Sequence, residues 1–111
     1  MRGFGGGGPG GMGDLVRQAQ QAQKNLQKVQ EDLRQRVVEG RAGGGAVTAF
    51  VNGQQELVKI AIKPEVVDPA DVAMLEDLVA AAVRAGLEAS KKMMQEEMAK
   101  AMGGMRVPGL F

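Results

Sequence analysis

The stretch AVTAFVNGQQELVKIAI, residues 46–62, decides how this chain folds. Apolar residues alternate with other residues on both sides of Asn52-Gly53, a pair that is typical of two-residue hairpin turns. Such a turn would place Val47 opposite Val58, so that the apolar residues of both strands share one face of a sheet. That face would consist of Val47, Ala49, Val51, Val58, Ile60 and Ile62.

The flanking residues extend this sheet and then end it. VVEGRA (37–42) is a further candidate strand, and GGG (43–45) separates it from the hairpin. Pro64 ends the last strand, because proline lacks the backbone N–H that a sheet ladder uses. The sequence therefore predicts three short strands between residues 37 and 62.

A helix precedes the strands. Apolar residues recur at steps of three and four from Leu15 to Leu33, and they fall within roughly 40° of one line. Asp14 is expected to cap this helix, because its carboxylate can accept hydrogen bonds from first-turn amides. The apolar seam consists of Leu15, Ala19, Ala22, Leu26, Val29 and Leu33, and the last three are predicted to contact the core or a second copy.

A second and longer helix follows the strands. In DPAD (68–71), Asp68 is expected to be the N-cap and Pro69 the first helical residue. The helical pattern continues to about Met102, which corresponds to on the order of 50 Å of helix. Its predicted core or dimer residues are Leu75, Leu78 and Val79.

These elements define an α+β fold in which a helix, a three-stranded antiparallel sheet and a long helix form one domain, residues 14–102. Flexible tails are expected at residues 1–13, which are glycine-rich, and at residues 103–111. Both helices are longer than the sheet can cover, so they would project as arms. A projecting helix with an apolar seam needs a partner, and this predicts a homodimer.

The residue inventory argues against an enzyme. The 111 residues include no Cys, His, Trp or Tyr, and Thr48 and Ser90 are the only side-chain alcohols. The glycine-rich start lacks the Lys-Ser/Thr pair of a phosphate-binding loop, and no strand precedes it. We therefore expect no catalytic residue, metal, cofactor or small-molecule substrate. No stretch has the length of a membrane span or the apolar core of a signal peptide, which favours a cytoplasmic location without a membrane partner.

The distribution of charge suggests a different kind of partner. The net charge is only +1, but residues 1–63 carry nine basic against five acidic side chains. Arg17, Lys24 and Lys28 lie roughly 180–220° around the first helix from Leu15, interspersed with glutamines. Such a face can neutralise the phosphates of duplex DNA, although a solvated helix face has the same pattern.

A protein-interaction module is the alternative. It would use the apolar seam of the first helix together with methionines at 93, 94, 98 and 102. Methionine side chains adapt to irregular surfaces, but they also serve as ordinary packing residues.

The order of several segments resembles the YbaB/EbfC family of nucleoid-associated proteins. They are GGGAVTAFVNGQQELVKIAIKPEVV (43–67), MLEDLVAAAVRAGLEASKK (74–92) and the GGM…PGLF tail. The likeness extends over nearly the whole chain, including the glycine-rich head and the glutamine-rich first helix. It implies an α–β–β–β–α protomer and a homodimer that forms through the sheets.

The resemblance also implies a function. Proteins of this family bind double-stranded DNA through their helical arms, belong to the nucleoid and affect gene expression. Low sequence specificity is expected from the modest charge. Carried to this chain, the DNA-binding residues would be Arg17, Lys24 and Lys28 on the first helix and Lys91, Lys92 and Lys100 on the second.

Overall fold

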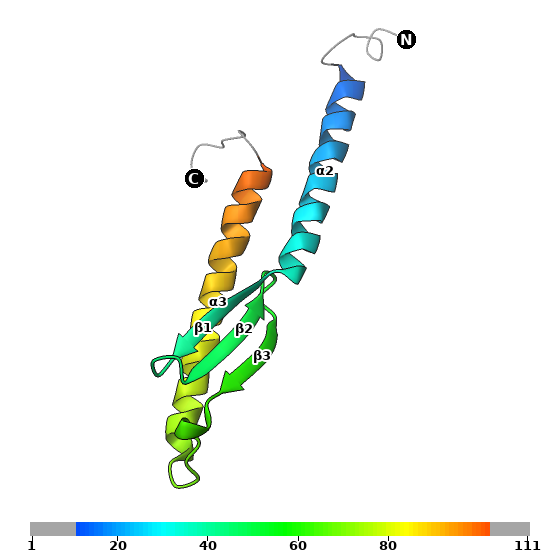
Figure 1. Ribbon diagram of the computed structural model, residues 1–111. Coiled ribbons are helices and arrows are strands. Elements are labelled where there is room, and N and C mark those ends of the chain that lie inside the picture. The colour runs from blue at the N-terminus through cyan, green and yellow to red at the C-terminus, as the bar shows by residue number, and fades with distance from the viewer. Residues whose placement is uncertain (1–10, 103–111) are drawn as a thin grey trace.

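The computed structural model describes residues 11–102, and these form one continuous arrangement of two helices and one sheet (Figure 1). The predicted tails lie outside the described residues, except that Gly11, Met12 and Gly13 belong to the start of the first helix. The elements in chain order are α2 (Met12–Gln35), β1 (Val37–Ala42), β2 (Val47–Asn52), β3 (Leu57–Ile62), the short 3-10 helix η1 (Pro64–Val66) and α3 (Val72–Ala101).

The sheet is antiparallel throughout and its strand order is β1-β2-β3, as the sequence predicts. The helix α3 lies across one face, over β1 and β2, and the other face is not covered by any described element (Figure 1). Gly40 and Gly86 make this close contact possible. A Cβ atom on Gly40 would lie 2.1 Å from the backbone nitrogen of Gly86, so α3 rests on the strand backbone itself.

The core lies between α3 and the central strand. Val47, Ala49, Val51 and Ala82 are fully buried. The predicted core or dimer residues Ile60, Leu75, Leu78 and Val79 are half-buried at its margin, whereas Ile62 remains 39% exposed. The reason is that α3 leaves β3 almost uncovered.

The hairpin between β2 and β3 differs from the predicted two-residue turn. Val47 pairs with Ile62 rather than with Val58, and the register shifts between Phe50 and Val51. Four residues, Gly53–Glu56, lie between the strands, and the N–H of Asn52 donates to the carbonyl of Glu56 (2.9 Å). This bond closes a three-residue loop, Gly53–Gln55, in which Gln55 has positive φ, at 61°. This is the hairpin in which a turn is followed by a left-handed residue and a bulge. The apolar face is preserved between Val47 and Phe50, where the register differs from the predicted one by four residues. Beyond the shift, Val51 pairs with Leu57, so the prediction for Val58 is wrong: it has no partner in this register and is 58% exposed.

Both predicted helix caps are wrong by a few residues. Gly11 is the N-cap of α2, and Asp14 lies inside the first turn, where its charge favours the positive end of the helix. Asp71, not Asp68, caps α3 by accepting a hydrogen bond from the N–H of Met74 (3.2 Å). Asp68 instead accepts from the N–H of Ala70 (2.9 Å) and closes the turn that precedes the helix.

The molecule is strongly elongated. Its principal extents are 80 × 26 × 16 Å and its radius of gyration is 22.0 Å. A compact chain of this length would have a radius of gyration of about 13 Å. The excess length comes from the two helices, which extend beyond the same end of the sheet and point in a similar direction (Figure 1).

Candidate nucleic-acid interface

Two helical arms and the contacts at their base form the candidate interface. We call residues 12–28 the α2 arm and residues 91–101 the α3 arm. The apolar seam of α2 meets the rest of the protein only near the sheet, since Leu33 is buried, Leu26 and Val29 are half-buried, and Leu15 is 58% exposed. The outer part of the α2 arm is therefore a helix without a core of its own.

The base of the arms is held by polar contacts. Arg36, just after α2, forms an ion pair with Glu97 of α3 at 3.2 Å. Hydrogen bonds from Arg36 and then Lys100, which lies 3.3 Å from the same carboxylate, lower the pKa of Glu97. The N–H of Gly53 donates to the carbonyls of Leu33 (2.7 Å) and Arg36 (3.0 Å), which ties the hairpin loop to the end of α2. These contacts set the direction in which the arms leave the sheet.

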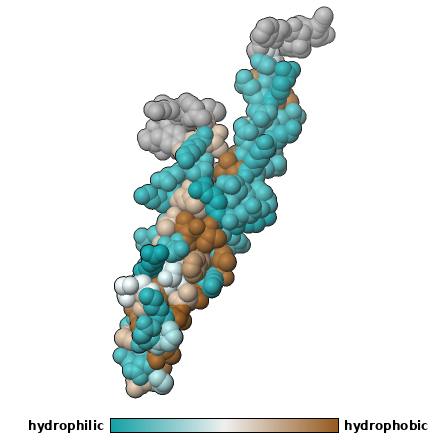
Figure 2. Space-filling model, in the orientation of Figure 1, coloured by the Kyte–Doolittle hydropathy of each residue, from teal (hydrophilic) through white to brown (hydrophobic). Residues whose placement is uncertain are grey.

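The three predicted cations of the α2 arm are all exposed. Arg17 lies 3.9 Å from Asp14 in an ion pair on the helix surface. Lys24 and Lys28 have no carboxylate within ion-pair distance among residues 11–102. Their charge is thus available to an external anion. Figure 2 shows that hydrophilic residues cover this arm along the visible face.

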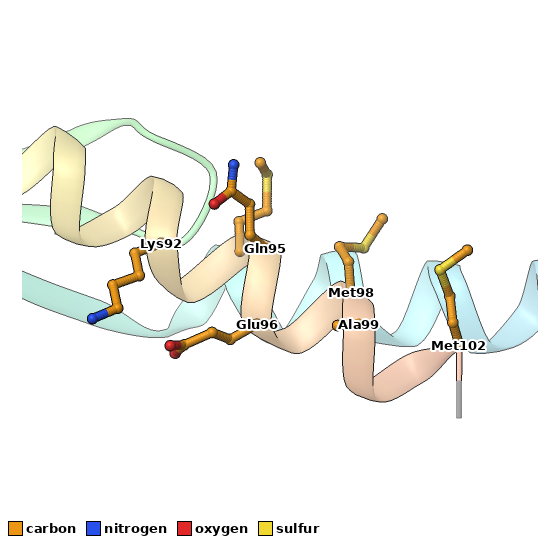
Figure 3. A pocket seen from close by; sticks show the side chains of 7 residues that line it. Lys92, Gln95, Glu96, Met98, Ala99 and Met102 are labelled. Atoms are coloured by element: carbon orange, nitrogen blue, oxygen red, sulfur yellow. The ribbon is translucent and has the colours of Figure 1, made fainter. Parts of the chain in front are cut away.

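The three predicted cations of the α3 arm are exposed as well, but their surroundings are more acidic. Lys100 pairs with Glu97, and Lys92 shares its stretch of helix with Glu96. Figure 3 shows Lys92 and Glu96 extending to the opposite side of the helix from Met98 and Met102. Lys91 and Lys92, by contrast, lie in no ion pair within the described part of the chain. Each arm therefore carries two lysines that form no ion pair with a described carboxylate.

A methionine-lined hollow of about 690 Å³ lies on the α3 arm (Figure 3). Met94 and Met98 are half-buried there, and Met102 is 38% exposed. In residues 11–102 there is no group of His, Cys, Asp or Glu side chains that could hold a metal ion, and no helix is long and apolar enough to cross a membrane.

Two polar features escaped prediction from the sequence. The first is the Arg36–Glu97 ion pair, which joins residues 61 positions apart and leaves no local signal. The second is a group of cations on the open face of the sheet: Arg41, Lys59 and Lys63. The alternation of β1 and β3 could have revealed this second group, because these residues occupy the positions between the inward-facing ones.

Comparison with known proteins identifies the family. A model of the YbaB/EbfC DNA-binding family matches residues 8–105. The chain belongs to this family. A nucleoid-associated protein of Alkaliphilus metalliredigens is 48% identical over 111 residues, which cover 99% of this chain and 97% of the relative. A nucleoid-associated protein of Clostridium perfringens is 55% identical over 105 residues, covering 95% and 94%.

A solved structure shows the same fold. The crystal structure of an uncharacterized protein, HP0035 from Helicobacter pylori, superposes with a TM-score of 0.72 at 20% sequence identity. The match covers 83% of this chain and 97% of that one. The family assignment and the projecting arms together make duplex DNA the ligand to consider for the exposed lysines.

Proposed function

We propose that this protein is a nucleoid-associated protein that binds double-stranded DNA as a homodimer, through its helical arms and with low sequence specificity. The observation that carries the proposal is the pair Lys24 and Lys28, exposed on an arm of a chain of a DNA-binding family and not neutralised by any described carboxylate. Lysines of this kind replace counterions on DNA phosphates, which supplies affinity without reading bases. Lys91 and Lys92 extend the same surface to α3.

The homodimer is supported by apolar surface that one chain leaves exposed. Leu57, Val58 and Ile62 of β3 are 50%, 58% and 39% exposed, and Val67 beyond them is 53% exposed. The strand β3 is also an edge of the sheet, with backbone groups free to pair. Exposed apolar residues on an edge strand mark an association surface, and a second copy would cover them while bringing two pairs of arms together.

Low sequence specificity follows from the chemistry of the arms. Specific recognition relies on bidentate contacts from Arg, Asn or Gln to base edges. The α2 arm carries glutamines and Asn25 beside its cations, so the proposal of low specificity rests on the two lysines without a described carboxylate partner, which meet phosphates as point charges, and on the net charge of only +1. A protein that holds phosphates without selecting bases can coat long stretches of the nucleoid. We propose that it affects gene expression by this route, through access to DNA rather than through one operator.

The salt dependence of DNA binding tests the proposal. If Lys24 and Lys28 of both protomers each contact one phosphate, then Lys24→Gln/Lys28→Gln removes four contacts and about 3–4 units from the slope of log K against log salt. The affinity of the wild type should fall about 100-fold more than that of the variant between 50 and 200 mM salt. The assay is fluorescence anisotropy with a short duplex, and light scattering on the same samples reports the dimer.

A matched control variant distinguishes a specific contribution of the α2 arm from a general effect of net charge on DNA binding. Arg34 lies on the same helix near the sheet and pairs with Glu31 at 3.6 Å. Arg34→Gln removes one positive charge, as do Lys24→Gln and Lys28→Gln singly, and glutamine keeps a high helix propensity in each. We expect the two lysine variants to bind more weakly than Arg34→Gln. Equal DNA affinity of all three variants would refute the role of the α2 arm in DNA binding. Absence of DNA binding by the wild type at low salt would refute the proposed function.

The protein-interaction module remains a second candidate because of the methionine-lined hollow on the α3 arm. An open hollow with Met94, Met98 and Met102 can receive an apolar side chain from a protein partner. The test is a pull-down with this chain immobilised. A partner protein that stays bound after nuclease treatment, but does not bind the Met98→Gln variant, would favour this function.

A further inference from the structure

An open hollow of about 640 Å³ lies at the end of the sheet that is farthest from the arms. It is lined by Arg41, Thr48, Lys63 and the glycine loop Gly43–Gly45, which joins β1 to β2 (Figure 1). None of these residues belongs to the arm surface described above. We call this site the glycine-loop hollow.

The sheet register explains why two cations meet here. Arg41 pairs with Thr48 across β1 and β2, and Ala61 pairs with Thr48 across β2 and β3. Lys63 follows two residues after Ala61, so it lies on the same face, and its N–H continues the ladder by donating to the carbonyl of Ala46 (2.9 Å). Thr48 thus presents a hydroxyl on the central strand, flanked by a guanidinium and an ammonium group from the two outer strands.

The glycine loop leaves the hollow open. Gly43, Gly44 and Gly45 all have positive φ, at 64°, 66° and 94°. A Cβ atom on Gly44 or Gly45 would meet nothing within 4 Å, so the glycines are required by backbone conformation rather than by packing. In residues 11–102 the amides of Gly43 and Gly44 donate no backbone hydrogen bond in this loop, whereas those of Gly45 and Ala46 do. These two amides have no hydrogen-bond acceptor among the described residues.

The charge around the hollow favours an anion. Arg41, Lys59 and Lys63 share the open face of the sheet with one carboxylate of the strands, Glu39. Glu39 contacts Arg41 at 2.7 Å, but the contact uses a single nitrogen, and a guanidinium has five N–H donors. Arginine, lysine, a hydroxyl group and backbone amides are the groups that bind phosphate oxygens in proteins.

We propose that the glycine-loop hollow binds a phosphate group, and that its occupant is the backbone of a second segment of duplex DNA. The choice of DNA rests on the proposed function. About 17 Å of helix and about 17 Å of strand separate Lys24 from Arg41, so the cations of the α2 arm and those of the glycine-loop hollow lie well apart. A protein with cations at both ends can hold two segments of DNA at once.

Phosphate binding itself is tested on the full chain by NMR titration with inorganic phosphate. We expect saturable shifts of the amide signals of Gly43, Gly44 and Thr48 in the wild type. Lys63→Gln should reduce the affinity about tenfold. Lys59→Gln removes the same charge from the same face of the sheet, but Lys59 does not line the hollow and lies over the Phe50 ring (5.7 Å to its centroid), so this variant should reduce the affinity less than Lys63→Gln does. Glu39→Gln should raise the affinity, because it releases Arg41. The site would be overturned if phosphate caused no shift of these amide signals, or if Lys59→Gln and Lys63→Gln weakened phosphate binding equally.

DNA bridging distinguishes this inference from the proposed function. Beads that carry one duplex capture a second, labelled duplex when the protein connects them. Arg41→Gln/Lys63→Gln should bind a single short duplex within twofold of the wild type but capture about tenfold less labelled DNA. Lys24→Gln/Lys28→Gln should lose both activities. Wild-type capture by Arg41→Gln/Lys63→Gln would refute the second DNA contact while leaving the arms intact, and phosphate shifts without loss of capture would assign the hollow to free phosphate instead.

Discussion

The contact between Gly40 and α3 allows a sharp prediction about how the arms are positioned. A Cβ atom on Gly40 would lie 2.1 Å from the nitrogen and 2.7 Å from the Cα of Gly86, and 2.3 Å from the carbonyl oxygen of Ala82. All three atoms belong to the backbone of α3, so no side-chain rotation can relieve the overlap. Because comfortable contacts begin near 3.5 Å, α3 would have to retreat by more than about 1 Å in Gly40→Ala.

The cost of that movement can be worked out from the same contacts. Overpacking a core costs about 1–3 kcal/mol, and a gap of this size forfeits a quarter to a half of the dispersion energy of each contact that it opens. Alanine recovers about 0.5–1 kcal/mol of strand entropy. The loss of dispersion energy and the gain of strand entropy oppose each other, so we expect Gly40→Ala to lower the free energy of unfolding by about 1–3 kcal/mol, a large share of the stability of a small domain.

Two other glycines of the chain serve as matched controls. A Cβ atom on Gly86 would approach Cγ2 of Val51 at 2.8 Å, so one methyl group of a buried β-branched side chain has to shift, rather than a helix backbone. Gly86→Ala also gains about 1 kcal/mol of helix propensity, so its net cost should be smaller. Gly13, in the first turn of α2, has open space around it, and Gly13→Ala should leave the stability unchanged or raise it.

Urea unfolding followed by circular dichroism measures all four proteins. The protein concentration must be the same for each, because a dimer has a concentration-dependent stability. The expected order of stability is Gly13→Ala at or above the wild type, then Gly86→Ala, then Gly40→Ala. A cost below about 0.5 kcal/mol for Gly40→Ala would refute the direct contact between strand and helix backbones.

Two further predictions concern the polar contacts around α3. Ser90 is fully buried, donates to the carbonyl of Asn52 and accepts from the N–H of Gln55 (3.2 Å). Ser90→Ala should therefore lower the free energy of unfolding in urea by about 1–3 kcal/mol. Ser90→Thr is the control, because it retains the hydroxyl group. Arg36 lowers the pKa of Glu97 below its ordinary 4.5, so the stabilisation is complete above that pH and is lost as the pH falls through the lowered value. Unfolding of Glu97→Gln from pH 7 to pH 3 should therefore show a weaker acid dependence than the wild type, and parallel curves would exclude the ion pair as the cause.

The strands could be predicted from the sequence, but the loop between β2 and β3 could not. Alternation over residues 46–62 reports which side of each strand is apolar, and that is a local property. The conformation of the loop depends on contacts with other parts of the fold. Gly53 lies against Leu33, where a Cβ atom would come within 2.6 Å of the carbonyl oxygen, so packing against α2 requires this glycine. The side chain of Asn52 accepts from the N–H groups of Gln54 (2.9 Å) and Glu56 (3.0 Å), which favours a three-residue loop.

The helix caps illustrate a competition between neighbouring acids. Asp68 and Asp71 both satisfy the local preference for an N-cap, and Pro69 favours the first of them. In the structure each aspartate binds a different amide, so the first closes a turn and the second begins the helix. The difference of three residues leaves the apolar side of α3 unchanged, because that side is set by the period of the helix rather than by its first residue.

The candidate site was predictable only in part, for a physical reason. The sequence places Lys24 and Lys28 opposite the seam of α2, and that arrangement depends on helical periodicity alone. The charge that remains available to DNA depends on ion pairs, and these differ between the arms. Lys100 is held by Glu97, which is held in turn by Arg36, a residue from the other helix. Only the folded chain shows which cations the protein already neutralises.

The shape of the α2 arm connects stability with binding. Its outer turns are too short to be stable as an isolated helix in water, and the seam residue Leu15 finds no core in one chain. The ion pair of Asp14 with Arg17 contributes little at this exposed position. Whatever covers the seam or neutralises Lys24 and Lys28 must therefore also stabilise the helix. In the proposed complex a second copy would do the first and a DNA duplex the second, so both would act on the same weakly supported element, and binding either one would favour the helical state that the other requires.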